Sequence, residues 1–463
     1  MNQFVVVYIF VSIPFCTSFT SIATLGATSN NIASFAENTA AIVNALNIAN
    51  SGSGAARTVL VPATGTYYIT ALTVQGLNGV TLQIDGTLIF INDATYWTRD
   101  SKGFISGLYF LKCNNFVIKG SGTIDGQGWI WWATVIATKV DNRPRSMIDI
   151  RESFNFRLEG LTLVNSPQYY VYLYDLKDVV VRYLTIFTDS QHPITKAEIF
   201  PLNTDGIDIL ATNVQVHDVS ITNYDDAIAV KPCKPQWTYC QCSSNIFVRR
   251  VYVYHGVGVS IGSVPPSDDN CVRDVTFMDF RLDRPMKAIY IKTNPGTSGI
   301  GEISNIMYRD FYITNALWWV VYIGPQQQLQ PQDTGTTGCM YYPVNTYCPT
   351  QWRVNIFDIT LFNITAIDTI AYYNSPGIIR CDPSSPCTNI RFVDVNVYPQ
   401  GITSMSDYKG VEQLLMSMFG SSTTDYYWRY IVDNASGASV RSSPQFIKTS
   451  PIPGESATPS AVP

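Results

Sequence analysis

Short runs in which apolar and polar residues alternate recur along most of the chain. They begin at Asn115, Asn155, Asp178, Asn213, Asn245, Cys271, Asn305, Asn355 and Asn389. Alternation with a period of two predicts β-strands with one buried face. Most of these starts lie 23 to 40 residues apart, and repetition at such an interval predicts stacked coils.

The segments between these runs contain no long amphipathic helices, which disfavours a doubly wound α/β sheet. A coil of short strands buries its apolar face only by stacking on the next coil. We therefore predict an all-β fold, a single-stranded, right-handed parallel β-helix that forms one domain at 23–434. Its coils are expected to run from about residue 55 to about residue 430.

Both ends of the predicted solenoid carry a different pattern. Residues 36–48 place apolar side chains at positions 41, 42, 45, 46 and 48, which is the spacing of one amphipathic helix. An N-terminal capping helix of this kind would cover strand edges that otherwise lie open. Residues 435–463 are rich in Ser and Pro, which predicts a flexible tail.

The chain begins with an apolar run from Phe4 to Phe15, whose 12 residues fall short of the ~20 that span a bilayer. Small polar residues follow it, as in an export signal, although no basic residue precedes it. A buried strand is the alternative interpretation. We predict a signal peptide at 1–22 and a secreted, extracellular protein without a membrane partner, since no other segment is apolar enough to span a bilayer.

Export gives the ten cysteines an oxidising environment, and Cys16 would leave with the signal. Two local disulfides are expected, Cys339 with Cys348 and Cys381 with Cys387. The pairing within a third group remains open: Cys233, Cys240, Cys242 and Cys271. Cys113, inside a strand-like run, is expected to be a buried free thiol, and zinc is disfavoured because the cysteine spacing is wrong and no His accompanies it. Asn363 and Asn434 lie in glycosylation sequons.

Composition narrows the class of protein further. Charged residues make up 14% of the chain, and the net charge is −5 without any basic run. A nucleic-acid partner is therefore not expected. The 46% hydrophobic and 13% aromatic content excludes a disordered chain. We expect a monomer.

Polar residues are densest at 203–208 (NTDGID) and 224–231 (YDDAIAVK). Both segments lie at ends of strands in neighbouring coils, so stacking in register would bring Asp205 over Asp225 and Asp226. Mutual repulsion would then raise the pKa of at least one carboxyl. A glycoside hydrolase needs such an arrangement, with one acid protonated and another ionised. Ordinary turn carboxylates or a calcium site fit the same spacing equally well.

Four sequence blocks give the chain a family resemblance. They are Gly120–Gly128 followed by Trp131 and Trp132, NTDG at 203–206 with the Asp225–Asp226 pair, Gly256–Ser263, and Ile289–Lys292. Over roughly residues 30–400 the chain resembles the polygalacturonases and related pectin hydrolases of glycoside hydrolase family 28, and the blocks occur in that family's order. The resemblance implies a pectin-lyase-like solenoid and a pectic polysaccharide substrate.

The same resemblance implies roles for individual residues. Asp225 would be the general acid of an inverting mechanism, while Asp205 and Asp226 would position and deprotonate the water. Asn203 would hydrogen-bond the sugar or hold Asp205, and Lys292 would pair with a substrate carboxylate. No metal or cofactor is implied.

Two positions depart from the family pattern. Val257 stands where the family has His, and Tyr290 stands where it has Arg. His255 is a candidate replacement for the imidazole, since on a strand it would share the side of Val257; a surface His is the alternative. Lys231 is a candidate replacement charge, with a solvated Lys as the alternative. Tyr290 offers a stacking face for sugar instead of a charge.

These departures predict weak activity on plain polygalacturonate and favour a rhamnogalacturonan or modified galacturonan. They also motivate an alternative function, a catalytically weak or inactive pectin-binding relative. A β-elimination lyase on the same architecture would use a central Arg or Lys and often calcium. The aspartates in hydrolase order disfavour it.

Overall fold

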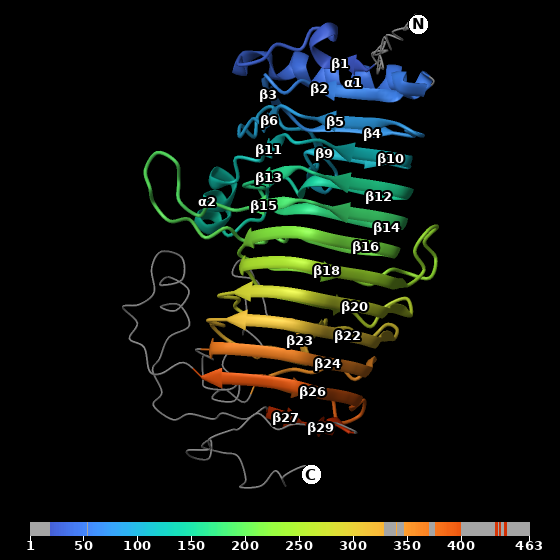
Figure 1. Ribbon diagram of the computed structural model, residues 1–463, viewed down its shortest axis with the longest axis vertical. Helices are drawn as coiled ribbons and strands as arrows, with labels where there is room; N and C mark the ends of the chain where they lie inside the picture. The colour runs from blue at the N-terminus through green and yellow to red at the C-terminus, as the bar shows by residue number, and fades with distance from the viewer. Residues whose placement is uncertain are drawn as a thin grey trace, which may run out of the picture.

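The computed structural model describes residues 19–52, 54–327, 339, 347–369, 376–399, 431–433, 435–436 and 439–441. The strands stack in parallel register into one elongated solenoid, with the N-terminus at one end and the last strands at the other (Figure 1). The predicted all-β parallel β-helix is confirmed. In the described part of the chain, no helix is both long and apolar enough to cross a membrane.

Each coil contributes strands to three faces. The first face contains β2 (Thr58–Val61), β5 (Thr81–Ile84), β10 (Asn114–Lys119), β12 (Ser146–Glu159), β14 (Tyr169–Arg182), β16 (Ile207–Asn223), β18 (Ser243–His255), β20 (Asn270–Asp283), β22 (Gly301–Thr314), β24 (Val354–Thr369) and β26 (Cys387–Pro399). The second face begins with β3 (Thr66–Ile69), β6 (Thr87–Phe90), β11 (Thr123–Asp125), β13 (Thr162–Val164) and β15 (Thr185–Phe187), and continues in the last residues of β16 and the long strands after it.

We call the third face the acid face. It comprises β4 (Leu72–Gln75), β9 (Leu108–Leu111), the first residues of β12, β14 and β16, and then β17 (Asp226–Val230), β19 (Gly258–Val264), β21 (Ile289–Thr293), β23 (Val321–Gln326), β25 (Gly377–Arg380) and β27 (Ile431–Asp433). Outside these faces, β7 (Arg99–Asp100) and β8 (Gly103–Phe104) form a small antiparallel pair, and the 3-10 turns η1 (Ile22–Leu25), η2 (Ile32–Ser34) and η3 (Gly54–Arg57) lie near the N-terminus.

The polar residue that opens most of the alternating runs has a structural cause. A left-handed backbone conformation occurs at Asn115, Asn155, Asp178, Asn213, Asn245, Asn305 and Asn389. Asn and Asp tolerate this conformation best among residues with a side chain. Their side chains also stack from coil to coil, as where Asn155 donates to Asn115 at 2.7 Å and Asn245 donates to Asn213 at 3.1 Å.

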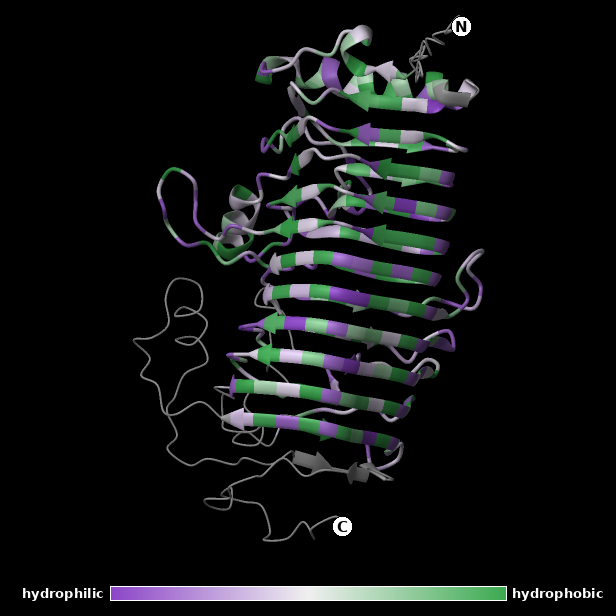
Figure 2. Ribbon diagram, viewed as in Figure 1, coloured by the Kyte–Doolittle hydropathy of each residue, from purple (hydrophilic) through white to green (hydrophobic). Residues whose placement is uncertain are grey.

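Apolar side chains stack in the same way inside the solenoid. One such row, in register from coil to coil, contains Val181, Val216, Val248, Phe277, Tyr308, Leu361 and Phe392. All of them are buried, and the rings of Phe277 and Tyr308 lie stacked 5.0 Å apart. Figure 2 shows the resulting alternation of apolar and polar residues along the strands.

The predicted capping helix is present. Helix α1 (Phe35–Ser51) lies across the N-terminal end of the solenoid (Figure 1) and buries Ala41, Ile42, Ala45 and Leu46. Buried Asn38 fastens it to the first coils by donating to the carbonyl oxygen of Tyr68 at 3.0 Å. The apolar face of the helix thus covers the first coil, on which no further coil stacks.

A second helix, α2 (Trp129–Thr138), was not predicted. Its sequence WIWWATVIAT is apolar almost throughout, so it shows no amphipathic period. It packs on the side of the solenoid by Trp131 and Trp132, and the indole nitrogen of Trp132 donates to the carbonyl oxygen of Ser166 at 3.1 Å.

Short strands lie at both predicted domain boundaries. Residues 1–18 of the predicted signal peptide lie outside the described residues, β1 (Thr20–Ser21) pairs with β2, and Ile22 is fully buried. At the other end, β28 (Ala435–Ser436) and β29 (Ser439–Arg441) pair with β26 within the segment predicted as a tail. The signal peptide at 1–22 and the tail at 435–463 stay predictions. Residues 442–463 lie outside the described residues.

The two predicted disulfides, Cys339–Cys348 and Cys381–Cys387, are confirmed. The third group pairs as Cys233–Cys240 and Cys242–Cys271, which sequence spacing left open. Cys113 is buried and outside any disulfide, as expected. Asn363 is exposed, which a glycosylation site requires, whereas Asn434 lies outside the described residues.

Candidate active site

The three predicted aspartates meet on the acid face. Asp205 lies two residues before β16, and Asp225 and Asp226 lie at the turn into β17, which pairs with the start of β16. Each carboxyl has an oxygen within 4.8 Å of one on the other two. The spacing of the two sequence segments therefore predicted this convergence correctly.

Hydrogen bonds and a close contact between two strands fix the backbone around the aspartates. Asn223 donates from its side-chain nitrogen to the carbonyl oxygens of Thr204, Asp225 and Asp226 at 2.8, 2.9 and 3.0 Å. At Gly206 a β-carbon would lie 2.4 Å from the carbonyl oxygen of Ala227, so the close approach of the two strands requires glycine. These contacts hold the carboxyl groups near one another despite their repulsion.

Asp225 and Asp226 differ sharply in their surroundings. Burial, and then the charges of Asp205 and Asp226, raise the pKa of Asp225 to about 7. Asp226 accepts a hydrogen bond from the Ser260 hydroxyl at 2.6 Å and pairs with the Lys292 ammonium at 2.7 Å. Burial alone would raise the pKa of Asp226, but Lys292 and Lys231 outweigh it and hold the pKa below its ordinary value. One carboxyl is thus protonated beside another that is ionised.

Asp205 belongs to a second charged contact. Its carboxyl lies 3.4 Å from the Lys231 ammonium, which lies 2.8 Å from Asp208. Burial, and then the charge of Asp208, raise the pKa of Asp205 well above its ordinary value. Lys231 is therefore an ion-paired residue of the acid cluster and not a solvated lysine at the end of a strand. Asp208, within the NTDGID segment, and Ser260 were missed as partners.

Asn203 is held from a different direction. The guanidinium of buried Arg143 donates to the side-chain oxygen of Asn203 at 2.7 Å and to the carbonyl oxygen of Pro167 at 3.1 Å. Arg143 lies in the connection between α2 and β12, far from Asn203 in sequence, so no local signal predicted the contact. Asn203 itself remains a proposed substrate ligand.

The two departures from the family pattern meet in one aromatic cluster. Val257 packs against a group comprising Tyr290, Trp318, Trp319 and Tyr322. Two ammonium groups lie near the Tyr290 ring, with the Lys287 nitrogen 4.1 Å and the Lys292 nitrogen 4.6 Å from its centre. Lys287 was not singled out from the sequence.

His255 does not share a strand with Val257. It ends β18 in a left-handed conformation, with φ of 63°, and Gly256 follows with φ of 73°, so the rule of alternating sides does not apply. Its ring stacks on Tyr224, 5.2 Å away. Burial and the charge of Arg284 lower the pKa of His255 to about 4, so the ring stays neutral at neutral pH. The strand rule that placed His255 on the side of Val257 therefore does not apply, and its role as a replacement for the imidazole stays a prediction.

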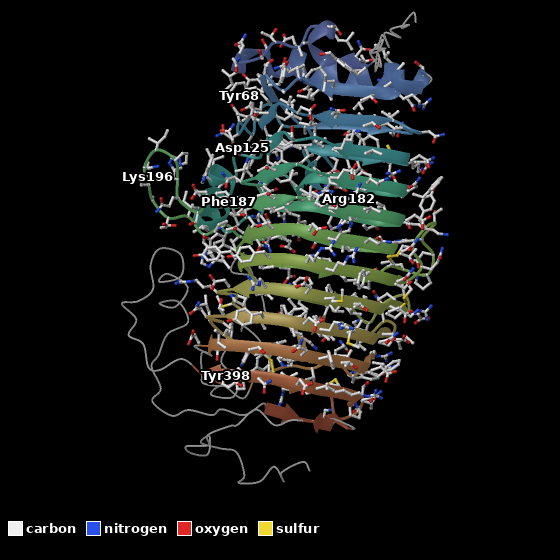
Figure 3. All side chains as sticks on the ribbon, in the orientation of Figure 1. Tyr68, Asp125, Arg182, Phe187, Lys196 and Tyr398 are labelled. Carbon is white, nitrogen blue, oxygen red and sulfur yellow. A yellow bond between two sulfur atoms is a disulfide. The ribbon has the colours of Figure 1, made fainter. Side chains whose placement is uncertain are left out.

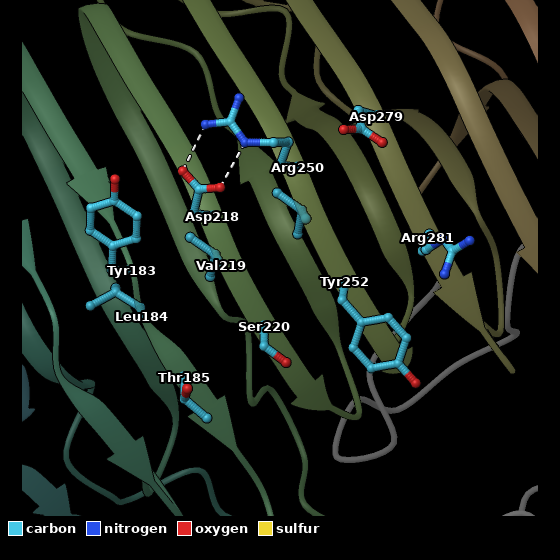
Figure 4. A pocket seen from close by; sticks show the side chains of 11 residues that line it. Tyr183, Leu184, Thr185, Asp218, Val219, Ser220, Arg250, Tyr252, Asp279 and Arg281 are labelled. Carbon is cyan, nitrogen blue, oxygen red and sulfur yellow. Dashed lines mark hydrogen bonds and ion pairs between the residues drawn. The ribbon is translucent and has the colours of Figure 1, made fainter.

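A shallow groove of about 520 Å³ lies away from the acid cluster, on the corner between the first two faces (Figure 4). Tyr183, Arg250 and Tyr252 line it, and Arg250 is paired there with Asp218 through two contacts of 2.7 Å. Lys196 lies on a loop that stands away from the solenoid (Figure 3). Two carboxyls, Asp218 and Asp279, line the groove, and Asp218 is the one paired with Arg250.

The carboxyl oxygens of Asp205, Asp225 and Asp226 lie close enough together to bind a divalent cation. However, the ammonium groups of Lys231 and Lys292 contact two of these carboxyls and already supply positive charge. The donor set fits an acid and base pair better than a calcium site.

Comparison with known proteins gives a consistent result. Residues 51–417 match the sequence model described as Glycosyl hydrolases family 28. The endo-xylogalacturonan hydrolase A of Aspergillus tubingensis is 29% identical over 280 residues, covering 59% of this chain and 65% of that protein. The exopolygalacturonase of Cochliobolus carbonum is 26% identical over 346 residues, covering 71% of each chain. The chain thus spans just under two thirds of the length of the xylogalacturonan hydrolases.

Solved structures share the fold. The crystal structure of endo-xylogalacturonan hydrolase from Aspergillus tubingensis superposes with a TM-score of 0.67 at 21% identity, covering 82% of this chain and 93% of that one. The polygalacturonase from Erwinia carotovora ssp. carotovora gives a TM-score of 0.62 at 20% identity, covering 91% and 96%.

Proposed function

The chain belongs to glycosyl hydrolase family 28, and from that premise we propose that it is a secreted enzyme that hydrolyses glycosidic bonds in a pectic polysaccharide. One observation carries the proposal: a carboxyl whose pKa is raised to about 7, Asp225, lies beside an ionised carboxyl, Asp226, in the same cluster. Two neighbouring carboxyls with opposed pKa shifts are the acid and base that glycoside hydrolysis requires.

In the proposed reaction Asp225 donates its proton to the leaving glycosidic oxygen. Asp226 accepts a proton from the attacking water, whose oxygen forms the new bond to the anomeric carbon. Asp205 has a raised pKa and one carboxyl oxygen without a hydrogen-bond partner, which suits it to orient the water rather than to serve as the main base. Asn203, Tyr290 and Lys292 are the proposed contacts to the sugar, and His255 adds a neutral ring beside Tyr224.

The separation of the carboxyls and the hydrogen bonding of Asp226 bear on whether the anomeric configuration is retained or inverted. Carboxyls of inverting enzymes are typically ~6.5–9.5 Å apart, farther than the separation here. However, both oxygens of Asp226 already bind a donor, Ser260 at 2.6 Å and Lys292 at 2.7 Å, which weakens this carboxylate as a nucleophile. We therefore propose that water attacks directly and that the anomeric configuration inverts.

Secretion is supported by the four disulfides of the described residues, since disulfides persist in oxidising compartments. The proposed partner is a pectic polysaccharide of the polygalacturonan or rhamnogalacturonan type. No cofactor is proposed.

The purified enzyme is expected to release reducing ends from a pectic polymer, in the presence of EDTA, without the absorbance of an unsaturated product. Proton NMR of the first product should show the anomer opposite to that of the substrate bond. An unsaturated product would establish a lyase, and retention of the anomer would make Asp226 a nucleophile. Polygalacturonate, xylogalacturonan and rhamnogalacturonan should be tested in parallel.

Binding of these polymers without any turnover would instead support the alternative, a catalytically weak pectin-binding relative. Val257 and Tyr290 favour that alternative, because each replaces a polar family residue in the cluster beside the acids.

The ratio kcat/KM is expected to fall as the pH rises through about 7, because this ratio reports the protonation of the free enzyme. Asp225 must be protonated to donate, and its pKa is raised to about 7, so the active form is full below that pH and lost above it. Well above it, kcat/KM should fall at least about tenfold per pH unit. A kcat/KM that stays constant from pH 6 to pH 9 would contradict Asp225 as the proton donor.

A further inference from the structure

A third ammonium group, besides those of Lys231 and Lys292, lies near the acid cluster. Lys287 lies two residues before β21 and is buried, with 3% of its surface exposed. Its nitrogen lies 4.1 Å from the centre of the Tyr290 ring, 5.0 Å from that of Tyr322 and 5.1 Å from that of Trp318. Three aromatic rings therefore orient a cation next to the proposed catalytic residues.

The position of Lys287 relative to the acids follows from the Tyr290 ring. Lys287 and Lys292 lie 4.1 and 4.6 Å from the ring centre, and Lys292 contacts Asp226 at 2.7 Å. Asp205 and Asp226 are buried to the same degree as Lys287, with 3% and 1% of their surfaces exposed. Lys287 is therefore no more buried than the acids that a substrate must reach.

The ammonium groups of Lys287 and Lys292 have different roles. Lys292 neutralises Asp226 and keeps it ionised, so binding a substrate carboxylate with the same ammonium would weaken the proposed base. Burial, and then the charge of Lys292, lower the pKa of Lys287 to about 7. An anion arriving beside Lys287 would relieve both effects, because it stabilises the charged form of the lysine.

We propose that Lys287 is a specificity-determining residue that binds the carboxylate of a uronic acid unit next to the cleaved bond, with Tyr290, Trp318 and Tyr322 as the wall of that subsite. This inference rests on the proposed function, since it assigns the site an acidic sugar. Lys287 also supplies a positive charge near Tyr290, the position at which the family has Arg. The weak activity on polygalacturonate that Val257 and Tyr290 predict is therefore not expected once Lys287 is taken into account.

Binding is best tested in the Asp225→Asn background, where turnover does not consume the ligand. The probe is trigalacturonate, titrated calorimetrically at pH 6, and Lys287→Met should weaken binding about ten- to a hundred-fold. Lys287→Arg should restore most of it. Lys112→Met is the matched control, because Lys112 is 67% exposed, lies several coils away, and should leave binding unchanged.

The fully methyl-esterified trigalacturonate separates charge recognition from a structural role. The esterified probe has no carboxylate. The Asp225→Asn protein and the double variant that also carries Lys287→Gln should therefore bind it with the same affinity. If both the acidic and the esterified probes weaken equally in Lys287→Gln, or if neither changes, the proposal is overturned. If Lys287→Met does not fold, Lys287→Gln replaces it in the binding test.

The hydrolysis assay with intact Asp225 distinguishes this inference from the proposed function. Charge-dependent binding without any hydrolysis would overturn the proposed function and support the role of Lys287. Hydrolysis that Lys287→Gln leaves unchanged on acidic substrates would overturn the role of Lys287 alone. If trigalacturonate does not bind at all, the proposed subsite does not exist.

Discussion

Replacing Asp225 with asparagine is expected to lower kcat on the preferred pectic polymer by about 10²–10⁴-fold, the usual contribution of a general acid. The amide has nearly the volume of the carboxyl, so its oxygen can still accept from the backbone nitrogen of Asp226, a contact of 2.8 Å in the structure. It has no acidic proton to donate to the leaving oxygen. The fold should therefore remain while the chemistry is lost.

Asp125→Asn is the matched control. Asp125 is also a carboxyl whose pKa burial raises, but it lies on β11, outside the acid cluster (Figure 3). Its variant should keep activity within about twofold, which separates catalysis from the general effect of removing a buried carboxyl. Initial rates of reducing-end release, with circular dichroism to verify the fold, measure both variants. Normal turnover in Asp225→Asn would remove Asp225 from the mechanism.

Lys231→Met is expected to reduce the free energy of unfolding by about 3–5 kcal/mol, because it leaves a buried carboxylate without its counter-charge. The Lys231 ammonium lies 2.8 Å from Asp208, whose side chain is 0% exposed. The double variant Lys231→Met with Asp208→Asn removes the orphaned charge as well and should recover most of the loss. Urea denaturation followed by fluorescence measures all three proteins.

The exposed pair of Lys234 and Asp268 provides the control for burial. It has a comparable distance, 2.7 Å, but its side chains are 40% and 45% exposed. Lys234→Met should therefore cost less than about 1 kcal/mol. Equal losses in Lys231→Met and Lys234→Met, or no recovery in the double variant, would show that burial of the Asp208 charge does not control the stability of this region.

The sequence predicted the solenoid because its signals are local. The alternation of apolar and polar residues reports strand faces, and the recurring Asn and Asp mark corners that need a left-handed backbone. The same locality explains why α2 was missed, since a helix that is apolar on every side has no period to detect. The short strands near the two ends were missed for a different reason: β1, β28 and β29 are defined by pairing with distant strands and not by their own composition.

By itself, the sequence determined that coils stack, that Asp205, Asp225 and Asp226 occur at matching ends of neighbouring strands, and which cysteines form two local disulfides. Only the tertiary structure decided which carboxyl keeps its proton, since that depends on burial and on partners such as Lys292, 66 residues from Asp226. It likewise decided that Lys231 pairs with Asp208, that the His255 ring stacks on Tyr224, and that Lys287 lies over Tyr290. The physical reason is that strand pattern is a property of neighbouring residues, whereas a pKa and a binding site are properties of the charges that distant coils bring together.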